Sequence, residues 1–307
     1  MSGRQELLAI VGPTATGKTA LAVTLALEFD GEIISADSRQ VYQYMDIGTA
    51  KPSQEQRETI PHHLIDVVDP DEEYNLALFL RQARTALQDV QSRSKLPILV
   101  GGTGQYVWAL MEGWQVPEVP PNPRLRRSLE KKASVDGAAA LHNELARVDS
   151  DRASRIDPRN TRRVIRALEI YYTSPDSSGS TLRKAPEFES AVLGLTLDRA
   201  SLYHRADRRV DAMIEAGWIA EVDELLHRGY RQELPSLSSL GYKELSLHLN
   251  GEISQDEAVE KIKLRTHRFV RQQYAWFRHE DARIRWFQVS PEGVQQATAY
   301  TLKAVRR

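Results

Sequence analysis

The stretch Leu7-Leu-Ala-Ile-Val-Gly-Pro-Thr-Ala-Thr-Gly-Lys-Thr19 joins an apolar segment to a complete phosphate-loop pattern, G-x-x-x-x-G-K-[ST]. The apolar segment predicts a strand, and residues 20–29 predict a helix. In this setting the glycines let backbone N–H groups turn toward phosphate oxygens, and the helix offers the same anion its positive end. Lys18 supplies a positive charge, and the Thr19 hydroxyl is a ligand for Mg²⁺. The stretch predicts a phosphate site in an α/β fold and leaves open which phosphorylated molecule is bound.

Further apolar segments predict how this unit continues. The predicted strands are Leu7–Val11, Glu32–Ser35, Pro97–Gly101, Ala191–Thr196 and Ile284–Val289. Helical stretches separate the first three, which is typical of a parallel sheet with helices on both faces. Because ligands bind at the carboxyl ends of such strands, we expect the phosphate loop, Asp37 and Thr103 to meet at one edge. The fold class is therefore α/β, a phosphate-loop-type parallel sheet with flanking helices plus a helical insertion.

The insertion begins at the proline-rich segment Val116-Pro-Glu-Val-Pro-Pro-Asn-Pro123, after which the chain reads as helical to Tyr172. A polar stretch, 173–181, precedes the next strand. We expect residues 1–115 and 190–307 to form the catalytic core and 116–189 a helical insertion domain. The predicted helices of the second half of the core are Arg199–Ala216, Ile219–Arg228, Ser239–Leu249 and Ser254–His279. In the last of them, Phe269, Trp276 and Phe277 are expected to be core contacts.

Composition narrows the function classes. The 307-residue chain has no cysteine, which excludes disulfides, thiolate nucleophiles and cysteine zinc sites, and it shows no membrane span or secretion signal. We expect a cytoplasmic protein without a membrane partner. The net charge is −1, yet 261–278 holds six Lys and Arg residues and no acidic one, and 152–166 holds six arginines and one aspartate. Such stripes bind a phosphate backbone or form a solvated helix face, and charge alone does not decide between them.

Three features describe the chemistry beside the phosphate loop. An NTP hydrolase needs a strand that ends in a carboxylate, but Leu96–Val100 leads into Gly101-Gly-Thr-Gly104, which weakens an ATPase interpretation. Asp37, at the tip of a predicted strand, can act as a general base, or it can cap the next turn. Arg205 and Arg209 lie one helical turn apart and could clamp a diphosphate or form surface ion pairs.

These segments together resemble the tRNA dimethylallyltransferase family. Besides the phosphate loop, the matching segments are Asp37–Tyr42, Met45-Asp-Ile-Gly-Thr-Ala-Lys-Pro52, Pro61–Asp66, Gly101–Gly104, Arg163–Glu169, Gly241-Tyr242 and Arg271–Arg278. The resemblance extends over nearly the whole chain. The absence of cysteine excludes the zinc finger of eukaryotic relatives.

The resemblance implies transfer of a dimethylallyl group from dimethylallyl diphosphate to the exocyclic N6 amine of the adenosine 3′ of the anticodon. The tRNAs concerned read codons beginning with U. It implies that Asp37 is the general base, that Thr103 assists at the reaction centre, and that Thr19 binds Mg²⁺. The implied diphosphate-binding residues are Gly12, Pro13, Thr14, Ala15, Thr16, Gly17, Lys18, Thr19 and Arg205. The implied tRNA contacts are Asp37, Ser38, Arg39, Gln40, Arg162, Arg163, Val164, Ile165, Arg166, Ser238, Ser239, Leu240, Gly241, Tyr242 and Lys243.

The partners that follow are the tRNA anticodon stem-loop and dimethylallyl diphosphate. We expect a monomer with no obligate protein partner, since no sustained heptad is present. A small-molecule kinase also explains the loop and Asp37, but not the arginine-rich insertion. An adenylate prenyltransferase resembles the first half of the chain only. An RNA-binding module with a vestigial phosphate loop does not account for the intact Lys18-Thr19 pair and Asp37.

Overall fold

The computed structural model describes residues 5–117, 119–174, 183–185 and 188–305. The chain divides into two compact units, one made of Met1–Met111 with Pro186–Arg307 and the other of Glu112–Ala185. The sequence had placed the two boundaries of the insertion at 116 and 189, a few residues later. Most of the polar stretch 173–181 lies outside the described residues.

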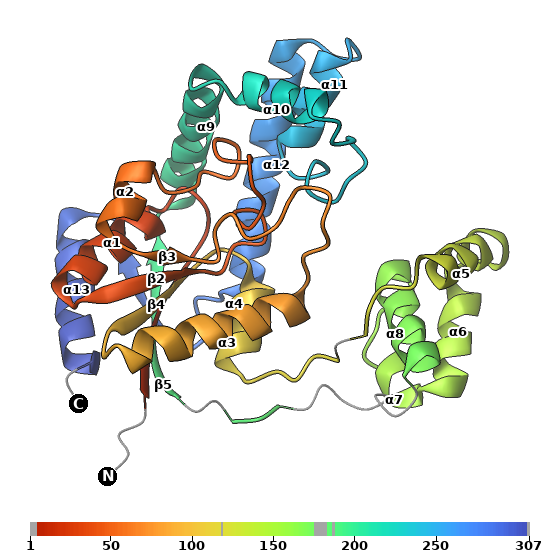
Figure 1. Cartoon of the computed structure of the whole chain (residues 1–307), viewed down its shortest axis with the longest axis horizontal. Coiled ribbons are helices and arrows are strands. Elements are labelled where there is room, and N and C mark those ends of the chain that lie inside the picture. Colours follow the sequence, from red (N-terminus) through yellow and green to blue (C-terminus); the bar gives the residue numbers. More distant parts are fainter. Residues whose placement is uncertain (1–4, 118, 175–182, 186–187, 306–307) are drawn as a thin grey trace. The chain divides into compact units, whose positions relative to one another are not determined.

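The first unit is built on a six-stranded parallel sheet in the order β3-β2-β4-β1-β5-β6 (Figure 1). Its strands are β1 Gln5–Val11, β2 Gly31–Ser35, β3 His62–His63, β4 Leu96–Val100, β5 Phe188–Thr196 and β6 Ile284–Gln288. All five predicted strands are present, and β3 is an additional one. The order places β1 inside the sheet between β4 and β5, so the phosphate loop opens at the middle of the carboxyl edge.

The register fixes which loops meet at that edge. Ser35 of β2 pairs with Val100 of β4, and Ile10 of β1 pairs with the same Val100. The segments that follow these strands therefore begin at the same level of the sheet. This register brings the phosphate loop, Asp37 and Gly101–Gly104 together although they lie far apart in the sequence.

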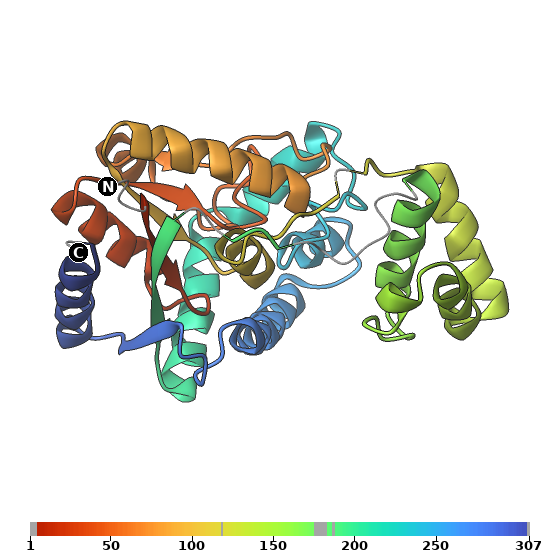
Figure 2. The same ribbon diagram turned by 90° about the horizontal axis from the view of Figure 1, so that it is seen from below.

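Helices cover both faces of this sheet. Those of the first unit are α1 Lys18–Glu28, α2 Gln54–Thr59, α3 Leu76–Ser92, α4 Gly104–Met111, α9 Arg199–Glu215, α10 Trp218–His227, α11 Tyr242–Leu249, α12 Gln255–Trp276 and α13 Pro291–Val305. Figure 2 shows α1 and α13 on one side of the sheet, whereas α3, which contacts β2 and β4, lies on the other. The four helices predicted for the second half of the core are present as α9 to α12. Their ends differ from the prediction by up to three residues.

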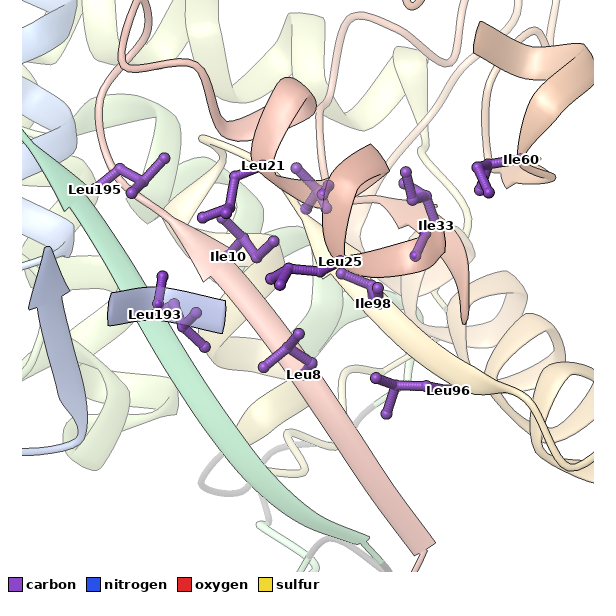
Figure 3. Close-up of a cluster of buried hydrophobic side chains, with 14 of the residues drawn as sticks. Leu8, Ile10, Leu21, Leu25, Ile33, Ile60, Leu96, Ile98, Leu193 and Leu195 are labelled. Carbon is purple, nitrogen blue, oxygen red and sulfur yellow. The ribbon is translucent and has the colours of Figure 1, made fainter. Parts of the chain in front are cut away.

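One core lies between α1, α13 and the sheet (Figure 3). Leu8 and Ile10 of β1 point toward Leu21 and Leu25 of α1 in this cluster, and all four side chains are buried. Because side chains alternate along a strand, the intervening Ala9 faces the helices on the opposite side of the sheet. Both faces of β1 are therefore apolar, which explains its continuous apolar sequence. The core holds the phosphate loop on a rigid strand and helix.

The described part of the second unit is a helical bundle made of α5 Pro123–Asp136, α6 Ala138–Val148, α7 Ser150–Ala153 and α8 Thr161–Thr173. Its core contains Leu141 and Leu145 of α6 packed with Val164 and Leu168 of α8. As the sequence predicts, it has no strand among its described residues; an isolated bridge, Trp114 to Arg183, is present near its boundary. Among the residues that the structure describes, no helix is long and apolar enough to cross a bilayer.

Candidate active site

The phosphate loop has a backbone that requires its glycines. Gly12 has φ 134°, and a Cβ there would lie 2.4 Å from the Leu195 carbonyl oxygen of β5. Gly17 caps α1 in the left-handed region with φ 83°. The Thr16 hydroxyl and the Lys18 ammonium both donate to the Pro13 carbonyl, at 2.9 and 2.7 Å. These two bonds hold the loop in a closed turn, and the turn positions its N–H groups at the start of α1.

Two cations face this loop from different elements. Burial, together with the positive charge of Arg209, lowers the pKa of Lys18 to about 7, and the nearby charge of Asp37 opposes the shift. Burial also lowers the pKa of Arg209, which donates to the Thr14 hydroxyl at 3.4 Å. Placing two cations together away from water is unfavourable unless an anion joins them. The site is electrostatically suited to a phosphorylated ligand.

Gln273 of α12 joins the loop to the segment after β4. Its carboxamide oxygen accepts from the Thr14 N–H at 2.8 Å, and its nitrogen donates to the Gly102 carbonyl at 3.1 Å. The side chain is 3 % exposed, and a Cβ on Gly102 would collide with it at 2.1 Å. Sequence reasoning included Gln273 in the segment Arg271–Arg278 that resembles the family but gave it no role, because nothing in the sequence indicates that this side chain reaches the phosphate loop.

Asp37 follows β2 at the same edge, as expected. Its Oδ1 accepts from the N–H groups of Arg39 at 2.8 Å and Gln40 at 3.4 Å, while Oδ2 has no hydrogen-bond partner among the described residues. Oδ1 therefore caps the following turn and Oδ2 is free to accept a proton. The two roles that the sequence left as alternatives are compatible in one side chain.

Thr103 holds that turn from the neighbouring strand. Its hydroxyl accepts from the Ser38 N–H at 3.1 Å and lies 3.4 Å from the Ser38 hydroxyl. The Thr103 N–H also donates to the Ala36 carbonyl at 3.3 Å. Thr103 is thus placed directly beside the Asp37 turn, and its hydroxyl orients that turn.

These groups line one cavity of about 880 Å³ within the first unit. Lys18, Thr19, Asp37, Thr103 and Arg209 all belong to its wall. Arg205, one turn before Arg209 on α9, does not. The structure therefore brings together most of the predicted diphosphate and catalytic residues and favours Arg209 as the arginine that reaches the anion.

The wall of the cavity opposite the phosphate loop comes from the loop before α11 and from α12. Of the predicted tRNA contacts there, Ser238, Ser239, Leu240 and Tyr242 line the cavity, whereas Gly241 and Lys243 do not. Phe269 and Trp276 also line it and are 40 % and 39 % exposed, so their assignment as core contacts was wrong. Both belong to the part of the cavity wall that α12 contributes. Phe277 is fully buried, as expected.

The predicted tRNA contacts of the second unit separate into two groups. Arg162 and Arg163 are exposed, whereas Val164 and Ile165 are buried in the core of the bundle and turn no side chain to solvent. Arg166 donates to Glu169 at 2.5 Å and to the Val119 carbonyl at 2.9 Å. A run of five helical residues cannot present one face to a ligand, because successive side chains rotate around the axis. Arg162 and Arg163 are the members of this run whose side chains are open to an RNA.

The groups present suit a Mg²⁺ ion held mainly by substrate. No cluster of three or more acidic or histidine side chains that could hold a metal occurs among the described residues. Thr19 lines the cavity at the start of α1, beside the anion site. Mg²⁺ commonly binds through one or two protein oxygens plus substrate phosphates and water. The donor set is compatible with that arrangement and not with an all-protein cage.

A phosphate loop and a carboxylate with a free oxygen that line one cavity are typical of a group-transfer enzyme. The family model described as IPP transferase matches residues 40–280, and one described as isopentenyl transferase matches residues 5–66. A tRNA dimethylallyltransferase of Roseiflexus sp. is 52 % identical over 89 % of this chain and 90 % of its own length. That of Roseiflexus castenholzii is 51 % identical over 95 % of this chain and 96 % of its own.

Solved structures of tRNA-modifying transferases also resemble this chain. The full-length tRNA isopentenylpyrophosphate transferase from Bacillus halodurans superposes with a TM-score of 0.72 and 38 % identity, covering 98 % of this chain and 96 % of that one. A eukaryotic dimethylallyltransferase acting on tRNA gives a TM-score of 0.82 and 28 % identity, covering 98 % and 80 %. The chain belongs to the tRNA dimethylallyltransferase, or IPP transferase, family. The resemblance, the fold class and the enzyme class inferred from the sequence are confirmed.

Proposed function

We propose that the protein transfers the dimethylallyl group of dimethylallyl diphosphate to the N6 amine of the adenosine 3′ of the anticodon. The acceptors are tRNAs that read codons beginning with U, and the products are N6-(dimethylallyl)adenosine and diphosphate. The observation that carries the proposal is the shared cavity, in which an anion loop and a carboxylate with a free oxygen face one space. A volume of about 880 Å³ is large enough for a small prenyl donor and a nucleoside together.

The donor binds through its diphosphate. Backbone N–H groups of the loop, Lys18 and Arg209 would contact the anion, and the Thr19 hydroxyl would be the protein ligand of a Mg²⁺ ion. That ion would help to neutralise the leaving group. Breaking an allylic carbon–oxygen bond leaves a stabilised carbocation and a negatively charged diphosphate. The rate therefore depends on how well the site neutralises the charge of the departing diphosphate. The lowered pKa of Lys18 shows that its charge has little competing solvation.

The acceptor amine is conjugated to a purine and is a poor nucleophile. As the nitrogen forms its bond to the allylic carbon, the carbon–oxygen bond breaks and its electron pair leaves with diphosphate. The amine then carries an extra proton, and Oδ2 of Asp37 accepts it. Oδ1 keeps its bond to the Arg39 N–H at 2.8 Å, so the turn holds the carboxylate in place during this transfer.

A base stacked in an anticodon loop cannot reach this centre, so the adenosine must leave the stack. Phe269 and Trp276 line the cavity and are partly exposed, so they would offer apolar surface to an extruded base. Arg162 and Arg163 offer exposed charge to the RNA backbone from the second unit. A kinase or an adenylate prenyltransferase would also bind a base, but it would not need exposed arginines for an RNA backbone.

The test offers the purified protein radiolabelled dimethylallyl diphosphate or ATP, with bulk tRNA or AMP as acceptor. Label in the tRNA fraction from the prenyl donor is the expected result. Asp37→Asn is expected to reduce transfer by at least about a hundredfold at saturating donor while tRNA binding is retained. ATP cleavage without label in RNA would refute the proposal, and full turnover by the variant would remove Asp37 from its role.

A further inference from the structure

Glu221 of α10 makes an unusual set of hydrogen bonds. Its Oε2 accepts from the N–H groups of Asp46 and Ile47 at 2.7 and 2.6 Å, and its Oε1 accepts from the Gly48 N–H at 3.1 Å. The Tyr242 hydroxyl donates to the same Oε1 at 2.7 Å. Bonds to an ionised acceptor are among the strongest in proteins. One carboxylate therefore holds three consecutive amides of the segment Met45–Pro52.

Packing fixes the same segment. The Trp218 indole is 1 % exposed and lies between two glycines: a Cβ on Gly48 would come within 2.1 Å of its Nε1, and a Cβ on Gly241 within 2.0 Å of its Cη2. The Tyr242 ring packs edge-on against it, with centroids 5.7 Å apart. Two segments that are far apart in the sequence thus pack against the same indole ring. A side chain at either glycine would displace that ring.

The backbone that is held in this way is strained. Tyr44 and Ala50 have φ of 63° and 50°, a region that residues with a Cβ rarely adopt. Such a conformation persists only when surrounding contacts determine it. Lys51 lies near the C-terminal end of the segment Met45–Pro52, and its side chain is 1 % exposed. It fixes that end by donating to the Tyr42 carbonyl and to Asp46, each at 2.7 Å.

The segment connects to the reaction centre. Its residues Gly48 to Pro52 form part of the cavity wall. The Gln40 carboxamide donates to the Thr49 and Ala50 carbonyls at 3.3 and 3.1 Å, and the Gln40 N–H is bound to Asp37 Oδ1 at 3.4 Å. A shift of Met45–Pro52 would therefore be transmitted to the turn that carries the proposed general base.

We propose that Glu221 is a positioning residue: it holds Met45–Pro52 as a rigid cavity wall and, through Gln40, orients the Asp37 turn for proton transfer. This inference rests on the proposed function for its effect on rate. It also assigns Tyr242 a part in that support, in addition to its place in the cavity wall. The phosphate loop has no bond to Glu221, so donor binding should be independent of it.

The test compares Glu221→Ala and Glu221→Gln with a matched control, Glu224→Gln, on the same helix. Glu224 is exposed, and among the residues that the structure describes its side chain pairs with Arg228 alone, at 2.9 Å. At temperatures where all variants are folded by circular dichroism, Glu221→Ala should lower kcat by about tenfold to a hundredfold with the KM for prenyl donor unchanged. Glu221→Gln should be intermediate, because one amide oxygen still accepts from Asp46 and Ile47. The control should match wild type.

Two further measurements separate positioning from a general loss of stability. Hydrogen exchange should accelerate in peptides covering residues 45–52 of Glu221→Ala and remain unchanged in those covering the phosphate loop. Tyr242→Phe combined with Glu221→Ala should be no slower than Glu221→Ala alone, since both act through one contact. Wild-type kcat in folded Glu221→Ala, or unchanged exchange over 45–52, would overturn the inference. Because exchange needs no turnover, an inactive wild type would count against the proposed function alone.

Discussion

Binding of the prenyl diphosphate should take up a proton at Lys18. The pKa of this side chain is lowered to about 7 by burial and by Arg209, so at pH 7 about half of the ligand-free molecules carry a neutral amine there. An anion in contact with the amine favours its charged form and raises the pKa again. The expected uptake is about 0.5 proton per site at pH 7 and approaches one at pH 8.5.

Isothermal titration calorimetry measures this quantity directly. Titrating dimethylallyl diphosphate in buffers of different ionisation enthalpy gives the number of protons exchanged, and Lys18→Met supplies the background from the ligand and from other groups. Affinity of the wild type should fall by up to about tenfold per pH unit above 7, and that of Lys18→Met should show little of this dependence. Uptake that is absent at pH 8.5, or equal in both proteins, would refute the reasoning.

The same shift predicts the pH dependence of ligand-free stability. The pKa of Lys18 is lowered in the folded protein, from 10.5 to about 7, so between these values the unfolded chain binds more protons than the folded one. The contribution of this group to stability therefore rises with pH through that range and is least favourable below pH 7. Chemical denaturation of wild type and Lys18→Met across pH 6.5 to 9 measures the difference.

Three other predictions follow from individual contacts. Arg209→Ala should weaken binding of the prenyl donor by about tenfold to a hundredfold and Arg205→Ala by less than about threefold, measured by calorimetry, because only Arg209 lines the cavity; equal effects would contradict this assignment. Glu169→Ala should lower the free energy of unfolding by roughly 2–4 kcal/mol in denaturant melts, because its buried carboxylate pairs with two partly exposed guanidiniums. Replacing Arg162 and Arg163 together by Ala should reduce the salt dependence of tRNA binding by roughly one and a half in log–log slope; an unchanged slope would mean that neither arginine contacts the RNA backbone.

Local patterns predicted the sheet and the rim of the site well. Strands β1, β2 and β4 are mostly apolar, with Glu32 of β2 an exception, and Gly12, Asp37 and Gly101 come within two residues of their ends. Both their type and their functional edge could therefore be read from short segments. Strand β3 was missed because its two residues, His62 and His63, are too few to show alternation. They become a strand only through pairing with Ile33 and Ile34 of β2.

The supporting residues could not be read in the same way. Gln273 binds the Thr14 N–H across 259 positions of sequence, and Glu221 reaches Asp46 across 175. Gln273 lies in the segment Arg271–Arg278 that resembles the family, and Glu221 lies in an ordinary helical pattern. In both cases the partner is defined only by tertiary packing. The run Arg162–Arg166 shows a different limit: the resemblance implies tRNA contacts for all five residues, but helical rotation buries the side chains of Val164 and Ile165.

The coupling among the charges at this site decides how variants of Asp37 must be interpreted. The carboxylate is one of the influences that raise the pKa of Lys18 against burial and Arg209, so Asp37→Asn should lower that pKa below about 7. Donor affinity of the variant would then fall near neutral pH, even though residue 37 does not bind the diphosphate itself. This indirect effect diminishes as the pH is lowered, because the amine then becomes protonated in both proteins. If Asp37 is the base, the loss of transfer persists at pH 6 with saturating donor; if Asp37 only sustains the charge of Lys18, activity recovers there.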